Sequence, residues 1–242
     1  MKRKNNTKRN VIILACACLG IIIGAAYMFF FSALLVGNDT KYVYIDNDDT
    51  IDSVYTKLSE FSSKGTQMTG FKMLVNNSKY ADNIRTGRYA VRPGEGSFVV
   101  FRHLKNGLQT PVNLVVPSVR TVDRLAAEFS KKLMLDSATI YHALADEATC
   151  QKYGYDTATI AAMFIPNTYD IYWNVSTEKL LDRMHKECKR FWNAERKEKA
   201  QAMKLSPVEV STLASIIDEE TANDGEKPMV AGMYYNRLML RN

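Results

Sequence analysis

The pattern of apolar and polar positions divides the chain into one long uncharged run and a remainder of mixed patterning. From Val11 to Val36 no residue is charged, and the run exceeds the ~20 residues that a helix needs to cross the bilayer hydrocarbon. An excess of Lys and Arg beside a first span keeps that side cytoplasmic. Such an excess precedes this run: Lys2, Arg3, Lys4, Lys8 and Arg9. We predict a transmembrane helix over 11–36, residues 1–10 in the cytoplasm and the rest outside it.

Two alternatives to an uncleaved anchor are a cleaved signal peptide and a lipoprotein. A signal peptide has a shorter apolar core that ends in an A-x-A-like site. A lipoprotein needs a suitable cysteine at the end of that core, and Cys16 follows Leu14 and Ala15. Apolar sequence continues for about twenty residues beyond Cys16, so cleavage there would leave most of the run in place. The pattern therefore favours an uncleaved anchor.

After the apolar run the pattern alternates between strand and helix periods. Lys41–Ile45 alternates as a strand, 46–49 is a turn, and a helix with Thr50 as its N-cap follows. The same order of strand, turn and helix recurs over a shorter stretch. A strand is predicted over 86–91, a turn over 92–96 and a helix over 97–106, with Ser97 as its cap and Gly107 as its stop. Another strand is predicted over 112–116 and another helix over 121–133. This half is mixed α and β in small units.

Beyond about residue 136 the chain is predicted to be mainly helical, including a long amphipathic helix over 176–196. One irregular island, 163–173, combines aromatic residues with polar ones, among them Asn167 and Tyr169. Aromatic faces beside hydrogen-bonding groups suit a sugar, which presents both apolar faces and hydroxyls. The alternative is that Phe164, Tyr169 and Trp173 fill the core, and the sequence leaves the two readings equal.

The composition argues against nucleic-acid binding, a disulfide framework and a metal site. The formal charge of +6 comes mostly from the five N-terminal cations, since the remainder holds 27 Lys and Arg against 26 Asp and Glu. A nucleic-acid-binding face needs a basic patch spread over a fold, so we expect no nucleic-acid partner. Beyond the apolar run there are two cysteines, Cys150 and Cys188, and the histidines are scattered. Neither a disulfide framework nor a metal site is predicted, and we expect no cofactor.

The strongest candidate for chemistry is the helix that begins near residue 206. Ser206 at the cap, Pro207 at the first helical position and Glu209 three residues after the cap form a capping box. On a helical projection with Val210 at zero, apolar residues occupy an arc from about 240° through zero to about 40°. Glu220 falls near 280°, inside that arc, whereas Glu219 falls near 180° and Asp218 near 80°. We therefore expect Glu220 to point toward the apolar face.

A carboxyl group on an apolar face is suited to acid catalysis. Burial raises the pKa of a carboxyl group, which prepares it to donate a proton near neutral pH. Protonation of the leaving oxygen is what cleavage of a glycosidic bond requires. The alternative for Glu220 is a partly buried structural glutamate held by a neighbouring arginine.

A second amphipathic helix is predicted from Pro228 to Leu240. Its predicted buried side consists of Val230, Met233, Tyr234 and Leu238. Asn236 and Arg237 are candidates to hydrogen-bond Glu220 or a sugar.

Together these two segments resemble the signature of the endolytic murein transglycosylases, the MltG or YceG-like family. The resemblance is carried by Ala214-Ser-Ile-Ile-Asp-Glu-Glu-Thr221 and Val230-Ala-Gly-Met-Tyr-Tyr-Asn-Arg-Leu238. Further landmarks are Thr86-Gly-Arg-Tyr, Pro93-Gly, Asn106-Gly-Leu-Gln-Thr-Pro-Val112 and Met163-Phe-Ile-Pro-Asn-Thr-Tyr169. The resemblance covers roughly residues 41–242, and an inner-membrane anchor agrees with it.

The resemblance implies an α+β protein with a LysM-like peptidoglycan-binding subdomain over 41–112 and a mainly helical YceG-like catalytic domain over 113–242. It implies cleavage of the MurNAc–GlcNAc bond within nascent glycan strands to leave 1,6-anhydroMurNAc ends, with no metal or cofactor. The glutamate of the family pattern corresponds to Glu220, and Asn236, Tyr169 and Asn167 are the expected substrate-binding residues. Peptidoglycan strands and cell-wall synthases are the expected partners, at the inner membrane.

The sequence departs from the family at its end. It stops at Asn242, whereas the family continues with a Gln-x-Asp-Pro-Thr-like segment, so a truncated catalytic domain is expected. Two other functions stay open. One is a non-catalytic peptidoglycan-binding or divisome scaffold, in which Glu220 is structural. The other is a hydrolase that uses water, with Asp218 or Glu226 as a second carboxylate.

Overall fold

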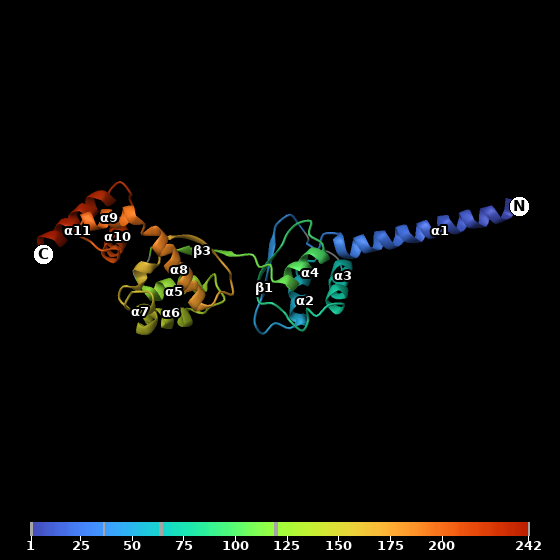
Figure 1. Cartoon of the computed structure of the whole chain (residues 1–242), viewed down its shortest axis with the longest axis horizontal. Helices are drawn as coiled ribbons and strands as arrows, with labels where there is room; N and C mark the ends of the chain where they lie inside the picture. The colour runs from blue at the N-terminus through green and yellow to red at the C-terminus, as the bar shows by residue number, and fades with distance from the viewer. Residues whose placement is uncertain (1, 36, 63–64, 119–120, 242) are drawn as a thin grey trace. The chain divides into compact units, whose positions relative to one another are not determined.

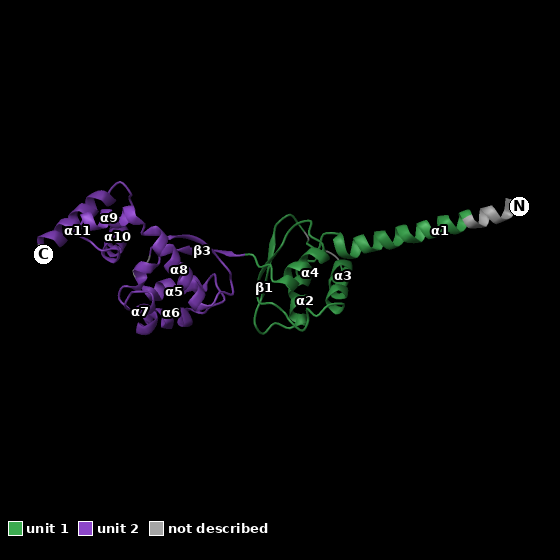
Figure 2. Cartoon of the chain, viewed as in Figure 1, with its two compact units in different colours: residues 1–110 green, residues 111–242 purple. Residues whose placement is uncertain are grey.

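The computed structural model describes residues 2–35, 37–62, 65–118 and 121–241, without the side chains of 2–8 and 241. The side chains of the predicted topology signals Lys2, Arg3, Lys4 and Lys8 therefore lie outside what it describes, as does Val36, the predicted limit of the span. Within the described residues the fold is α+β, mostly helical with two small sheets, as expected. The chain divides into two compact units, Met1–Thr110 and Pro111–Asn242 (Figures 1 and 2).

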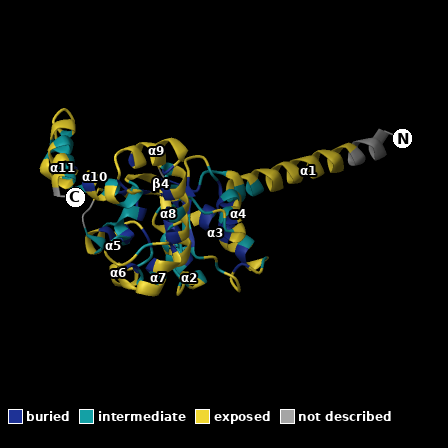
Figure 3. Cartoon of the chain, turned by 60° about the vertical axis from the view of Figure 1, so that its left-hand side comes forward, coloured by how far each residue is buried: buried dark blue, intermediate teal, exposed yellow. Residues whose placement is uncertain are grey.

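Unit 1 begins with the apolar helix. Helix α1 (Lys2–Ala26) continues into a π-helical turn, η1 (Tyr27–Phe31). Its residues from Arg9 to Gly24 are exposed, as the yellow ribbon in Figure 3 shows. Among the described residues this helix alone, over Arg9–Phe31, is long and apolar enough to cross a membrane. A signal sequence near the N-terminus meets the same test.

The globular part of unit 1 is a strand–helix–helix–strand arrangement followed by another helix. Its elements are β1 (Lys41–Ile45), α2 (Ile51–Ser59), α3 (Gly65–Asn76), β2 (Gly87–Val91) and α4 (Ser97–Asn106). The two strands pair antiparallel, with Lys41 opposite Val91 and Ile45 opposite Gly87. The core lies between this sheet and the helices, where Val43, Leu58 and Phe71 are buried. Helix α3 was not predicted from the sequence.

The end of the apolar helix is built into this core. Leu34 and Leu35, which follow η1, are buried among the core residues of unit 1. A side chain at Gly70 of α3 would collide with the carbonyl oxygen of Phe29, so α3 needs glycine where η1 passes. The ring of Phe31 lies 5.9 Å from that of Phe98 in α4. The last described residues of the apolar run therefore belong to unit 1, and the helix predicted over 11–36 is wrong at its end, because the helical part ends at Phe31.

In the globular part of unit 1, two of the predicted helix caps and stops are confirmed and one is wrong. Thr50 caps α2 in a capping box with Ser53, and Gly107 ends α4 with a left-handed φ of 67°. Ser97 is not the cap of α4, because Gly96 occupies that position. The Ser97 hydroxyl is buried and instead donates to the carbonyl of Gln67 in α3, at 2.7 Å.

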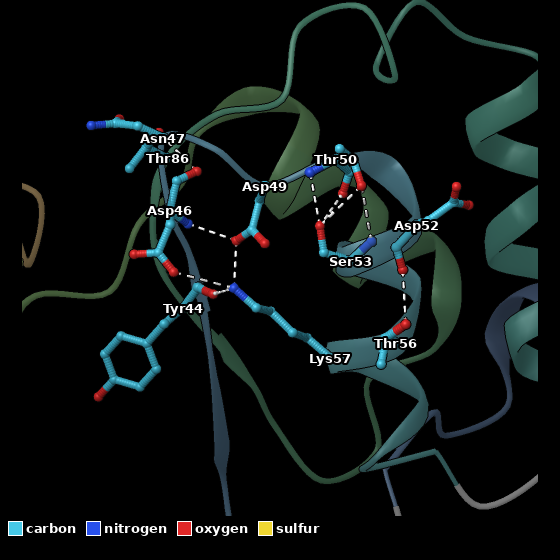
Figure 4. Close-up of polar contacts among 10 residues, drawn as sticks. All are labelled: Tyr44, Asp46, Asn47, Asp49, Thr50, Asp52, Ser53, Thr56, Lys57 and Thr86. Carbon is cyan, nitrogen blue, oxygen red and sulfur yellow. Dashed lines mark hydrogen bonds and ion pairs between the residues drawn. The ribbon is translucent and has the colours of Figure 1, made fainter.

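The turn between β1 and α2 is held by an ion-pair network (Figure 4). Lys57 Nζ lies 2.5 Å from Asp49 Oδ2 and 3.3 Å from Asp46 Oδ2, and it donates to the carbonyl of Tyr44. Burial opposes the charged form of Asp49, but hydrogen bonds from Lys57 and the Asp46 backbone outweigh it and lower the pKa of Asp49. These contacts fix how α2 leaves the sheet.

Unit 2 places a second antiparallel pair among helices. Its elements are β3 (Val112–Val116), α5 (Val122–Ser130), α6 (Ser137–Ala145), α7 (Glu147–Lys152), η2 (Ile160–Met163), β4 (Asn167–Ile171), α8 (Thr177–Phe191), α9 (Ala194–Ala202), α10 (Pro207–Glu220) and α11 (Lys227–Arg241). Val112 pairs with Ile171 and Val116 with Asn167. The strand β4 lies within the stretch that the sequence indicated as irregular.

The main core of unit 2 is formed by β3, β4 and helices α5 to α9. Phe129 and Leu144 are fully buried there, and Cys150 and Cys188 are buried as free thiols whose pKa values are raised by burial. The single helix predicted over 176–196 is wrong. Helix α8 ends at Phe191, and Asn193 caps α9 by accepting from the backbone N–H of Arg196 at 2.9 Å.

Candidate active site

The candidate site is built on α10, which begins where the sequence predicts. The Ser206 hydroxyl accepts from the backbone N–H of Glu209 at 3.2 Å, and the Glu209 carboxylate accepts from the N–H of Ser206 at 2.7 Å. Pro207 occupies the first turn, where its missing N–H costs nothing. This capping box fixes the start of the helix and therefore the angular position of every later residue on it.

Helix α11 packs against one side of α10 through a small apolar cluster. Its buried members are Leu205, Leu213 and Ile217, and its half-buried members are Val210, Val230, Ala231, Tyr234, Tyr235 and Met239. The prediction for α11 is wrong at Met233 and Leu238, which are exposed. Tyr235 donates its hydroxyl to the carbonyl of Met203 at 3.1 Å, which ties α11 to the end of α9.

Glu220 is the last residue of α10, and its side chain turns toward α11. The Tyr234 hydroxyl donates to Glu220 Oε1 at 2.7 Å, and this hydrogen bond raises the pKa of Tyr234. Leu213 and Ile217, the residues on the same side of α10, are buried in the cluster. The expectation of a buried carboxyl is nevertheless wrong, because Glu220 itself is exposed. The last turn of α10 extends beyond the apolar side chains of α11 that pack on this side of the helix, which leaves Glu220 exposed.

The neighbouring carboxylates are engaged in contacts that hold the turn between the helices. Asp218 accepts from Ser118 Oγ at 3.0 Å and pairs with Lys227 at 3.0 Å. The hydrogen bond from Lys227 lowers the pKa of Asp218, against a smaller effect of burial. Glu226 accepts from Thr221 at 2.9 Å and from the Asn223 amide at 3.1 Å. Both carboxylates therefore act as anchors of the turn.

A cleft of about 600 Å³ borders a different side of α10. It is lined mostly by apolar and small side chains, among them Phe164, Pro166, Trp192, Ala214 and Ser215. Asp218 is among its described lining residues, and Glu220 is not. The two sides of α10 thus differ, one covered by α11 and one open to the cleft.

The other predicted site residues lie in different settings. Asn236 is exposed on α11, and among the described residues Tyr234, rather than Asn236 or Arg237, hydrogen-bonds Glu220. Asn167 is exposed at the start of β4. Tyr169 is buried in the main core and donates its hydroxyl to the carbonyl of Ile165 at 2.9 Å, so its position favours the core role that the sequence left open.

Tyr234 is the residue at this site that the sequence did not predict as a partner of Glu220. The helical pattern placed its ring on the packed side of α11, which agrees with its position in the cluster. The hydroxyl of a half-buried tyrosine usually has a hydrogen-bond partner. This requirement is the sequence signal from which a polar group beside the Tyr234 ring could have been predicted.

Comparison with known proteins identifies the family. The model of the YceG-like family matches residues 43–241, which include most of β1 and the whole of α10. The chain belongs to the YceG-like family. This is the MltG family, known for murein transglycosylase activity, and membership implies peptidoglycan as the substrate.

Solved structures were also compared with this YceG-like chain. A yceG-like protein from Listeria monocytogenes, solved as a 2.6 Å crystal structure, is similar at 20% identity with a TM-score of 0.49. The similarity covers 84% of this chain and 71% of that one. Among curated proteins none matches this sequence.

Proposed function

We propose that this YceG-like chain is an endolytic lytic transglycosylase, which cuts MurNAc–GlcNAc bonds within nascent glycan strands and leaves 1,6-anhydroMurNAc ends. The observation that carries the proposal is the position of Glu220 within the family match. Its carboxylate is exposed at the end of a well-fixed helix and oriented by a hydrogen bond from the adjacent one. An exposed and oriented carboxyl group is accessible to an oxygen in a bulky polymer.

In the proposed reaction one carboxyl group acts first as acid and then as base. Protonated Glu220 gives its proton to the bridging oxygen as the bond from that oxygen to C1 breaks. The sugar's own 6-hydroxyl then attacks C1, and its proton passes to the Glu220 carboxylate, which restores the acid and closes the 1,6-anhydro ring. No second carboxylate is required, in agreement with the structural contacts of Asp218 and Glu226.

Asn236 and Asn167 are the proposed contacts to the glycan. Both are exposed, and an amide side chain can both donate to and accept from sugar hydroxyls. For Tyr169 the buried ring supports an indirect contribution, in which it holds β4 and thereby the segment that begins at Asn167.

We also propose that α1 is an uncleaved anchor in the cytoplasmic membrane, with the N-terminus inside. The packing of η1, at the end of the apolar helix, supports retention, because Gly70 of α3 accommodates the carbonyl of Phe29 and the ring of Phe31 lies beside that of Phe98. The cations before the span support the orientation. An anchor there would hold the enzyme beside the membrane-bound synthases that make new strands.

The glycan-binding role of unit 1 is a proposal of the same kind. The order β1, α2, α3, β2 with an antiparallel strand pair supports the LysM-like subdomain expected over 41–112. Unit 2 would then supply the chemistry over 113–242.

Product analysis tests the function directly. The full chain in detergent micelles is incubated with uncrosslinked glycan strands, beside its Glu220→Gln variant, and the products are identified by mass spectrometry. The proposal predicts internal cuts with 1,6-anhydroMurNAc ends that vanish in the variant. Reducing ends in place of anhydro ends would instead indicate a hydrolase. Binding of strands without any cut, equal in both proteins, would indicate the scaffold.

A further inference from the structure

The hydrogen bond between Tyr234 and Glu220 joins α10 to α11, in addition to the Asp218–Lys227 ion pair between the same two helices. The hydroxyl of Tyr234 lies 2.7 Å from Glu220 Oε1, and its ring is half-buried in the α10–α11 cluster. The hydroxyl is therefore held in place by packing rather than by the exposed carboxylate that it contacts. Among the described residues, no hydrogen-bond donor contacts Glu220 Oε2.

We propose that Tyr234 is a positioning residue for Glu220 in the reaction, an inference that rests on the proposed function. Because Oε1 accepts the tyrosine hydrogen bond, the transferable proton resides on Oε2, and the hydrogen bond sets the direction in which Oε2 points. A carboxylate accepts a stronger hydrogen bond than a neutral carboxyl group does. The contact therefore strengthens as the proton leaves for the bridging oxygen, and it favours the base that the second step needs.

Few other charged groups compete at this contact. On α11, the guanidinium of Arg237 lies 5.9 Å from the Tyr234 ring centroid. On α10, Glu219 is exposed and Asp218 is paired with Lys227. In the turn between them, Asp224 pairs with Lys227, and Glu226 accepts from Thr221 and Asn223. Tyr234 is thus the group best placed to respond to the charge of Glu220.

Two phenylalanine variants separate positioning from packing. Tyr234→Phe keeps the ring and removes the hydroxyl that contacts Glu220. Tyr235→Phe, the matched control, removes a hydroxyl whose hydrogen-bond partner among the described residues is the Met203 carbonyl. For the full chain we expect Tyr234→Phe to lower kcat about tenfold with little change in KM, and to move the alkaline decline of activity to higher pH. Tyr235→Phe should change neither. Equal kinetic effects of the two variants, or an unmoved pH profile in Tyr234→Phe, would overturn the proposal.

A second readout does not depend on catalysis. Tyrosine ring carbons of the full chain are followed by NMR through an alkaline titration. The raised pKa of Tyr234 should fall toward about 10 in Glu220→Gln and stay raised in Glu219→Gln. An unchanged pKa in Glu220→Gln would refute the contact itself, whether or not the chain cuts glycan. A fall in the pKa without any glycan cleavage by the wild type would leave the contact intact and refute the proposed function.

Discussion

The two apolar clusters of unit 2 differ in depth. In the main core, Phe129, Leu144, Met163 and Leu180 have no exposed surface, and eight of the described elements contribute buried side chains. In the α10–α11 cluster, the buried residues Leu205, Leu213 and Ile217 each keep 8–9% of their surface exposed. Helix α10, which carries Glu220, and helix α11 are therefore held as much by a cap, ion pairs and hydroxyl contacts as by apolar burial. Candidate chemistry lies on the less stable part of the unit, as is common for functional elements.

The largest expected effect comes from the main core. Phe129→Ala removes a fully buried ring that lies 5.7 Å from the ring of Phe164, so it should lower the free energy of unfolding by about 3–5 kcal/mol. Urea unfolding followed by circular dichroism measures it. A loss below about 1 kcal/mol would show that this core is not the principal source of stability.

A smaller and more local effect is expected in the second cluster. Ile217→Ala should cost about 2 kcal/mol, at the low end for such a truncation, because the cavity it leaves opens toward solvent. Hydrogen exchange should accelerate at amides of α10 and α11 and not at those of α5 and α8. Uniform acceleration across all four helices would show that the two clusters unfold as one.

The capping box should contribute less again. Ser206→Ala removes the hydroxyl that accepts from the Glu209 N–H and should cost about 1 kcal/mol. Ser215→Ala serves as the control within the same helix, because its hydroxyl donates to an already bonded helical carbonyl, that of Thr212. Similar losses of stability in thermal denaturation for the two variants would show that the Ser206 cap makes no specific contribution to stability.

The smallest effect is that of the Asp218–Lys227 pair, which is partly exposed. Because the pKa of Asp218 is lowered in the fold, its stabilisation is present above the ordinary carboxyl pKa and is lost as the pH falls through the lowered value. Asp218→Asn should therefore cost up to about 1 kcal/mol near pH 7, and the difference from wild type should shrink in acid. A difference that grows as the pH falls would have the wrong sign.

The local signals of the sequence were reliable where neighbouring residues decide the structure. The N-cap at Thr50, the capping box at Ser206 and the stop at Gly107 depend on residues within a few positions, and the structure has each of them. The helical projection likewise identified the side of α10 on which Glu220 lies. These features follow from the backbone geometry and the hydrogen bonds of a single helix.

The sequence could not supply what distant residues decide. The local sequence indicates Ser97 as a helix cap, but in the structure its hydroxyl donates to the carbonyl of Gln67, thirty residues earlier in the chain. Helix α3 has two weakly helical glycines, and Gly70 is required by the approach of Phe29 rather than by helix formation. The exposure of Glu220 depends on where the cover from α11 ends, which no projection of α10 alone contains.

The most direct test of the account compares two adjacent glutamates on one helical turn. Initial rates of 1,6-anhydroMurNAc formation from uncrosslinked strands are measured for the full chain, Glu219→Gln and Glu220→Gln, with circular dichroism as the check on folding. Glu219 is exposed without a described partner, so its variant should keep the wild-type rate within about threefold, whereas Glu220→Gln should lose about 10²–10⁴-fold or more. Comparable losses in both variants, or an active Glu220→Gln protein, would contradict the assignment of the acid to Glu220.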